Sequence, residues 1–171
     1  MADVNTLIYF EDKKGSKGLT IYPRELSITW GNDKRYWKWF GILLESQDFK
    51  VAEIPKLLDV CWLDIKGKFD MSRLTTGIKY EVGFIVMLKE PVSGWQNNPV
   101  TLRLELPDET SQSRNIDLSN VPRNEWKTLV IGEFTASKVA GDVLFSMKEI
   151  KKGYWKKGLI IKSVVVRPVY N

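Results

Sequence analysis

The chain has 171 residues, the size of one domain with a sizeable core, and its formal net charge is +5. It contains no histidine, which excludes Ser-His-Asp and Cys-His catalysis and any His-containing zinc site. A single cysteine, Cys61, excludes an internal disulfide, and no apolar run reaches the roughly 20 residues of a membrane helix. Because Met1–Phe10 lacks the basic start of a secretory signal, we expect a non-secreted protein. We also expect that it does not bind membranes, metals or cofactors.

Short alternating or β-branched segments, separated by turn residues, run through most of the chain. In Ile78–Lys89, every second residue from Tyr80 to Leu88 is apolar, which predicts one buried face. The predicted strands are Leu26–Trp30, Tyr36–Ile42, Val51–Ile54, Val60–Phe69, Ile78–Lys89, Val100–Leu106, Arg114–Leu118, Trp126–Phe134, Val143–Ile150 and Leu159–Arg167. About ten short strands with little helix predict an all-β fold, an antiparallel two-sheet β-sandwich of the jelly-roll kind.

The segment Glu25–Phe40 concentrates aromatic rings around a Gly-Asn-Asp turn signal. Flat rings beside amide and carboxylate groups suit a pyranose sugar, which is apolar on one face and hydroxylated at its edge. The carbohydrate-binding candidates here are Trp30, Asn32, Asp33, Tyr36, Trp37 and Trp39. Trp37 follows the turn and is the preferred stacking platform, whereas Trp30 continues an alternating apolar run and is better explained as core. Asn32 and Asp33 also fit an ordinary turn.

Trp95 is a further candidate, because it lies in the turn-rich loop Gly94–Pro99, where burial of a large ring is difficult. The loop composition predicts an exposed ring that forms a second sugar subsite or a dimer contact.

Three blocks, ELSITWGNDKRYWKW, VAEIPKLLDVCWLDIKGKF and YWKKGLIIKSVVVRPV, resemble the phloem protein 2 family of plants. The resemblance begins near residue 24, so we expect residues 1–23 to be an N-terminal extension and residues 24–171 to be the lectin domain. The resemblance implies a non-enzymatic, homodimeric lectin of the cytosol or phloem sap. Its implied ligands are chitooligosaccharides and glycoproteins bearing N-acetylglucosamine, with N-glycan cores as a further candidate. A glycosidase-type carboxylate pair stays formally open, but none stands out among 21 acidic residues.

A further family motif matches residues 126–134, WKTLVIGEF, which end in Gly-Glu-Phe. Thr128 stands where family members carry a glutamate. The resemblance therefore implies that Glu133 or the Thr128 hydroxyl contacts the sugar, or that this protein binds more weakly.

The basic segment Lys148–Lys157 supports an alternative function, because cations that follow phosphates beside rings that stack on bases are typical of RNA-binding proteins. The alternative RNA-binding residues are Lys151, Lys152, Trp155, Lys156 and Lys157. The same pattern also fits a solvated hairpin tip between two strands. A third alternative is a structural phloem filament protein that self-associates through Cys61 or an exposed strand edge.

Overall fold

The computed structural model describes residues 6–44, 50–151 and 154–170. Within these ranges the chain forms twelve strands and short 3-10 turns at Pro23–Glu25, Met71–Arg73 and Leu118–Asn120. The strands are β1 Leu7–Glu11, β2 Lys17–Ile21, β3 Ser27–Ile28, β4 Trp37–Leu44, β5 Lys50–Leu57, β6 Leu63–Asp70, β7 Lys79–Ser93, β8 Val100–Glu105, β9 Ser111–Ile116, β10 Lys127–Thr135, β11 Asp142–Glu149 and β12 Lys157–Pro168. No helix in these ranges has the length and apolarity needed to cross a bilayer.

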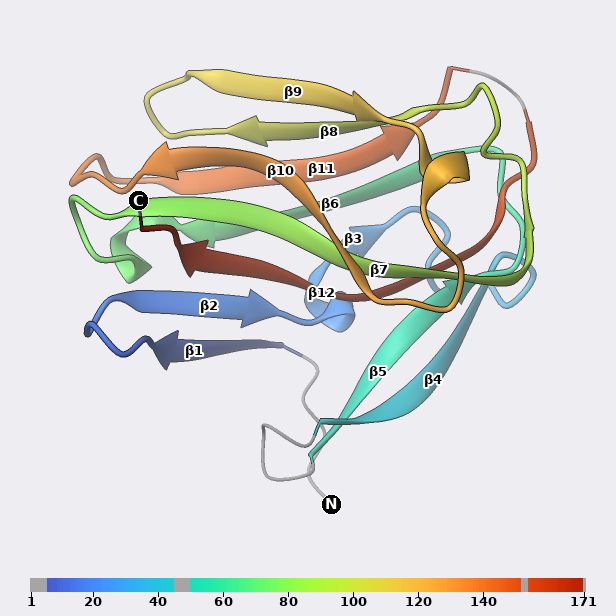
Figure 1. Cartoon of the computed structure of the whole chain (residues 1–171), viewed down its shortest axis with the longest axis horizontal. Coiled ribbons are helices and arrows are strands. Elements are labelled where there is room, and N and C mark those ends of the chain that lie inside the picture. The colour runs from blue at the N-terminus through green and yellow to red at the C-terminus, as the bar shows by residue number, and fades with distance from the viewer. Residues whose placement is uncertain (1–5, 45–49, 152–153, 171) are drawn as a thin grey trace.

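The strands form two antiparallel sheets that lie face to face (Figure 1). The five-stranded sheet has the order β3-β6-β11-β8-β9. In the seven-stranded sheet, β12 pairs along one edge with β7, which in turn pairs with β10. Its other edge pairs first with β5 and then with β2, so two hairpins, β4-β5 and β1-β2, extend the same sheet. The predicted all-β sandwich is confirmed.

The core lies between the sheets and follows the predicted alternation of β7. Its side chains from Tyr80 to Leu88 at every second position are all fully buried. Phe84 of β7 meets Phe145 of β11 edge to face, with ring centroids 5.8 Å apart, so aromatic packing joins the two layers.

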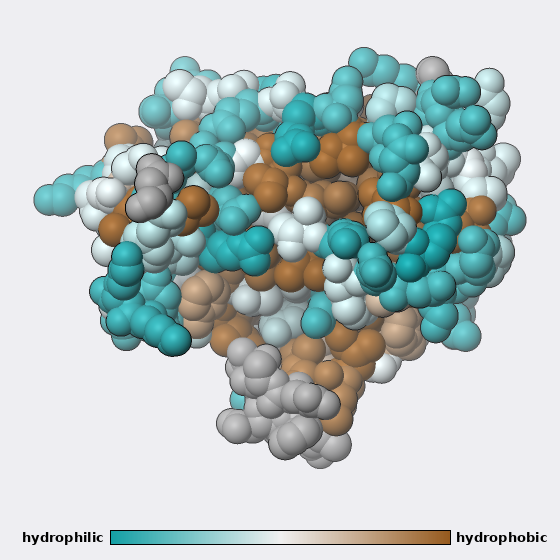
Figure 2. Space-filling model, viewed as in Figure 1, coloured by the Kyte–Doolittle hydropathy of each residue, from teal (hydrophilic) through white to brown (hydrophobic). Residues whose placement is uncertain are grey.

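The outer face of the seven-stranded sheet is also partly apolar. Ile85 and Met87 point away from the core and are half-buried. Figure 2 shows hydrophobic side chains gathered in the middle of the face formed by β7, β10 and β12, framed by hydrophilic residues.

Residues before Arg24 contribute two strands that the sequence analysis does not predict. Leu19 and Ile21 of β2 are fully buried, and Ile21 pairs with Val164 of β12. The Tyr80 hydroxyl donates a hydrogen bond to the Lys17 carbonyl from inside the sandwich. The seven-stranded sheet therefore includes strands that precede residue 24. The division of the chain into an N-terminal extension, residues 1–23, and a lectin domain, residues 24–171, stays a prediction.

The expected lysine-rich hairpin between residues 148 and 157 is wrong. β11 ends at Glu149 in the five-stranded sheet, and β12 begins at Lys157 in the seven-stranded sheet. The two strands belong to different sheets and do not pair.

Candidate functional site

A chain of tight turns shapes residues 24–39, which we call the tryptophan corner. β3 ends at Ile28, and Trp30 adopts a left-handed backbone conformation with φ of 58°. The backbone amides of both Tyr36 and Trp37 donate to the Asp33 carbonyl before β4 begins. The predicted strand Leu26–Trp30 is therefore shortened, and its alternation does not extend to Trp30.

This geometry reverses the roles expected for two tryptophans. Trp37 is only 2% exposed and belongs to the main core, so its role as an open stacking platform is wrong. Trp30, which was expected in the core, is 49% exposed. Its ring centroid lies 5.1 Å from that of Tyr36, and the positive φ accounts for its departure from the buried face.

Trp39 is half-buried under a cation. The Arg24 guanidinium carbon lies 3.6 Å from the centre of the Trp39 ring, and the indole Nε1 donates to the Gly31 carbonyl at 2.6 Å. Arg24 also pairs with Glu53 at 2.5 Å and donates to the Asn32 side-chain oxygen at 3.3 Å. Trp39 therefore stiffens the corner, while Trp30 presents a more exposed ring.

A cavity of about 370 Å³ opens in the tryptophan corner, and its size suits a small ligand. It is lined by Arg24, Asn32, Lys34, Trp37, Lys38, Trp39 and Leu58. The Trp37 Nε1 is buried and has no hydrogen-bond partner among the described residues. A buried indole N–H normally finds an acceptor, but this one has almost no accessible surface, so the walls of the cavity would have to move before a ligand could accept a hydrogen bond from it.

The carboxylate of Asp33 is already engaged within the corner. Arg35 pairs with it at 2.8 Å, and this hydrogen-bonded guanidinium lowers the pKa of the Asp33 carboxyl below its ordinary value. Among the described residues, no group of three or more metal-ligating side chains is placed to hold a metal ion. Because the carboxylates of Asp33 and Glu53 both face arginines, the corner is better suited to binding than to proton transfer.

Trp95 does not form the exposed ring that its loop predicts. It is 2% exposed, and its Nε1 donates to the Lys157 carbonyl at 3.0 Å. The loop can bury it because Gly94, with φ of 89°, lies directly against the Trp155 carbonyl, where any Cβ would clash.

Glu133 and Thr128 are not among the residues that line the cavity. Glu133 pairs at 2.9 Å with Lys79, the first residue of β7. Thr128 packs its methyl group over Gly83 in the first half of β7. Of the candidates at residues 30–39, Asn32, Trp37 and Trp39 line the cavity, whereas Trp30, Asp33 and Tyr36 belong to the corner but not to the cavity lining. Glu133 and Thr128 lie outside the corner.

The alternative RNA-binding residues are also dispersed. Lys156 is fully buried and donates to the carbonyls of Cys61 at 2.9 Å and Tyr154 at 3.0 Å, so its predicted contact with RNA is wrong. Lys151 and Trp155 are exposed, and Lys157 is half-buried in β12. Lys152 lies outside the described residues.

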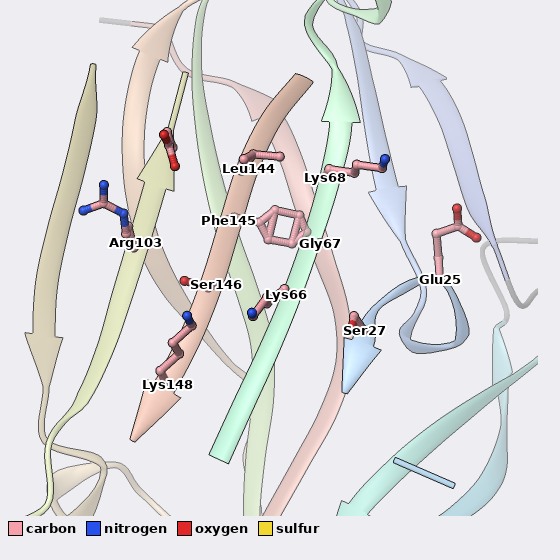
Figure 3. Close-up of a pocket in the computed structure, with 11 residues that line it drawn as sticks. Glu25, Ser27, Lys66, Gly67, Lys68, Arg103, Leu144, Phe145, Ser146 and Lys148 are labelled. Carbon is pink, nitrogen blue, oxygen red and sulfur yellow. The ribbon is translucent and has the colours of Figure 1, made fainter. Parts of the chain in front are cut away.

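A larger cavity of about 410 Å³ lies on the outer face of the five-stranded sheet (Figure 3). The side chains of Lys66 and Lys148 converge there from β6 and β11. The only aromatic residue in its lining, Phe145, is 2% exposed. Without an open ring this cavity lacks a stacking surface, and the tryptophan corner is the better candidate for a sugar.

Exposed rings that the sequence analysis did not assign to a sugar site lie on two loops near the corner. Trp62 is 44% exposed, Tyr154 61% and Trp155 53%. The parity of Trp62 was an available signal, since it is opposite to that of the buried residues Leu63 and Ile65. Nothing in the local pattern of residues 154 and 155 indicates that both remain exposed.

Comparison with known proteins gives a consistent result. A model of the family described as Phloem protein 2 matches residues 16–168. Protein PHLOEM PROTEIN 2-LIKE A1 of Arabidopsis thaliana is 45% identical over 163 residues, covering 94% of this chain and 65% of that protein. A protein named Lectin from Luffa acutangula is 37% identical over 162 residues, covering 94% of this chain and 75% of that protein. The chain thus spans about two thirds of the Arabidopsis relative.

Proposed function

Because this chain belongs to the phloem protein 2 family, we propose that it is a lectin that binds N-acetylglucosamine oligomers without changing them chemically. A related protein from Luffa acutangula carries the name Lectin. The single observation that supports a site at the tryptophan corner is the cavity of about 370 Å³ lined by Asn32 and Trp39, which opens in the same corner as the exposed ring of Trp30.

In this proposal the exposed ring of Trp30, which lies against the half-buried ring of Tyr36, supplies the stacking surface for the apolar face of a sugar. The Asn32 amide and the exposed lysines at the cavity, Lys34 and Lys38, supply directed hydrogen bonds to hydroxyl and acetamido groups. Each bond to a partly solvated site adds about 1 kcal/mol net, so affinity for one sugar unit is low. Binding to several units, or by two subunits, would raise it.

The proposal predicts that Trp30→Ala weakens chitotriose binding at least roughly tenfold, which corresponds to ~1.4 kcal/mol. Isothermal titration calorimetry measures the affinity. The matched control is Trp126→Ala, because Trp126 is also exposed but lies beside Lys162 rather than in the corner. Unchanged binding by the Trp30 variant, or an equal loss in the Trp126 variant, would contradict a site at the corner.

The same titration, repeated at several salt concentrations, distinguishes binding of a neutral sugar from binding of a nucleic acid. Binding of a neutral sugar releases no counterions, so its affinity should stay nearly constant between about 50 and 200 mM salt, whereas phosphate binding through several lysines weakens by orders of magnitude. We expect the flat response, with any RNA binding weak and steeply salt-dependent. RNA as the tighter ligand at the higher salt concentration would favour the alternative function.

Two further properties stay predictions. Residence in the cytosol or phloem sap rests on the family resemblance alone. The homodimer implied by that resemblance has a candidate contact surface in the apolar middle of the seven-stranded sheet's outer face, where Ile85 and Met87 lie (Figure 2).

A further inference from the structure

A buried cation fixes two loops at one end of the sandwich. The Lys156 side chain is 0% exposed, and its ammonium group is bound by two backbone carbonyls and by Glu149 at 3.8 Å. Burial lowers the pKa of the Lys156 ammonium. Burying a charged group is costly unless partners surround it. The Lys156 ammonium has these partners only when the two loops place their carbonyls beside it, so the interaction stabilises that one conformation of the loops.

The two loops that Lys156 joins carry the exposed rings. The backbone amides of Val60 and Lys156 donate to each other's carbonyls, at 3.0 and 2.9 Å, and form an antiparallel bridge. Trp62 follows this bridge on one loop, while Tyr154 and Trp155 precede it on the other. We call these three side chains the loop rings; each is at least 44% exposed.

The loop that carries Trp62 also contacts the tryptophan corner. The amides of Leu58 and Asp59 both donate to the Tyr36 carbonyl, and the Thr29 amide donates to the Asp64 carbonyl. Residues 58–64 therefore contact the segment that holds Trp30 and Tyr36 as well as the segment that holds Tyr154 and Trp155. The backbone segments that carry Trp30 and the loop rings are therefore joined to the same short stretch of chain.

We propose that the loop rings form a second stacking surface, which binds the further sugar units of an oligosaccharide whose first units occupy the tryptophan corner. This inference rests on the proposed function. Lys156 acts as a positioning residue: it does not touch the sugar, but it holds the carbonyls of Cys61 and Tyr154 and thereby the loops that display the rings.

The charged side chains around the loop rings are of both signs. The charged side chains within residues 58–64 are Asp59 and Asp64, both acidic, and the charge of Lys156 is opposed by Glu149 inside the protein. Exposed Lys151 and half-buried Lys157 lie beside Tyr154 and Trp155 in sequence, and Asp64 pairs with Lys66 at 3.7 Å, so the open aromatic faces rather than the charges favour a sugar here.

The experiment compares chitotriose with chitohexaose in titrations of the full chain. In the wild-type protein we expect the hexamer to bind roughly tenfold tighter or more, beyond the few-fold statistical gain from its several binding registers. The double variant Trp62→Ala/Trp155→Ala should keep the chitotriose affinity and lose that gain. Lys156→Met should also lose it, whereas the control Trp126→Ala should bind both sugars as the wild type does.

Each contrary result has a distinct meaning. If the wild type binds chitotriose but gains nothing with the hexamer, or if the double variant keeps the gain, the second surface is refuted while the lectin function stands. If light scattering shows that the double substitution changes the oligomeric state, the rings cover a second copy instead. If the wild type binds neither sugar, the proposed function fails and this inference fails with it.

Discussion

Replacing Trp37 with alanine is expected to lower the free energy of unfolding by about 3–5 kcal/mol, the usual range for removing a buried aromatic side chain. The ring is 2% exposed and packs within the main core cluster, so its removal leaves a cavity between the sheets. Urea denaturation followed by circular dichroism measures the loss.

The matched variant is Trp30→Ala, which removes the same side chain from the same corner. Trp30 is 49% exposed, so its replacement should change the free energy of unfolding by no more than about 0.5 kcal/mol. Alanine retains the Cβ that makes the positive φ unfavourable, so the backbone strain is unchanged. Similar losses in both variants would show that the two rings are not divided between core and surface as described.

Replacing Lys156 with alanine should lower the free energy of unfolding by a similar amount, about 3–5 kcal/mol. The substitution leaves the buried Glu149 without this cation and two backbone carbonyls without their donor. Thermal or urea unfolding measures the effect. Lys151→Ala, at an exposed lysine nearby in sequence, is the control and should fall within about 0.5 kcal/mol of the wild type.

A double variant separates the contribution of the Lys156–Glu149 ion pair to stability from the contribution of side-chain packing. Lys156→Met combined with Glu149→Gln removes both charges and keeps most of the packing, so it should recover much of the stability lost in Lys156→Ala. If Lys156→Ala is no less stable than Lys151→Ala, the ammonium group does not hold the two loops, and its role as a positioning residue is withdrawn.

The fold was predictable because one buried face of a strand leaves a period of two in the sequence. β7 is the clearest case, where apolar residues from Tyr80 to Leu88 recur at alternate positions and are all buried. The same rule did not reveal β1 and β2. Lys17–Ile21 is only five residues long, and its neighbours Glu11–Ser16 are mainly charged and polar turn residues.

The sequence predicted a candidate segment, but not which of its side chains are buried and which are exposed. Parity assigned Trp30 to the core, but a left-handed residue interrupts the alternation, and the sequence GND after it does not show where the turn begins. Trp95 was expected to be exposed because its loop is rich in turn residues, yet the loop packs against residues 155–157 and buries it. Such loop-to-loop contacts are long-range and leave no local pattern.

Lys156 illustrates a third limit, since charged residues are rarely buried unless they are paired. Its neighbours in sequence suggested a solvated basic tip. The groups that pair with it come from three places in the chain, the carbonyls of Cys61 and Tyr154 and the carboxylate of Glu149, which the crossover between the sheets brings together.

The most direct test of the central claim, that sugar binds at the tryptophan corner, is a titration of ¹⁵N-labelled protein with chitotriose, observed through the indole N–H signals of its seven tryptophans. We expect the signals of Trp30 and Trp37 to shift together with the ligand concentration, and those of Trp95 and Trp126 to stay in place. Shifts confined to Trp126, or no shift at either corner tryptophan when the protein is saturated with sugar, would contradict the account.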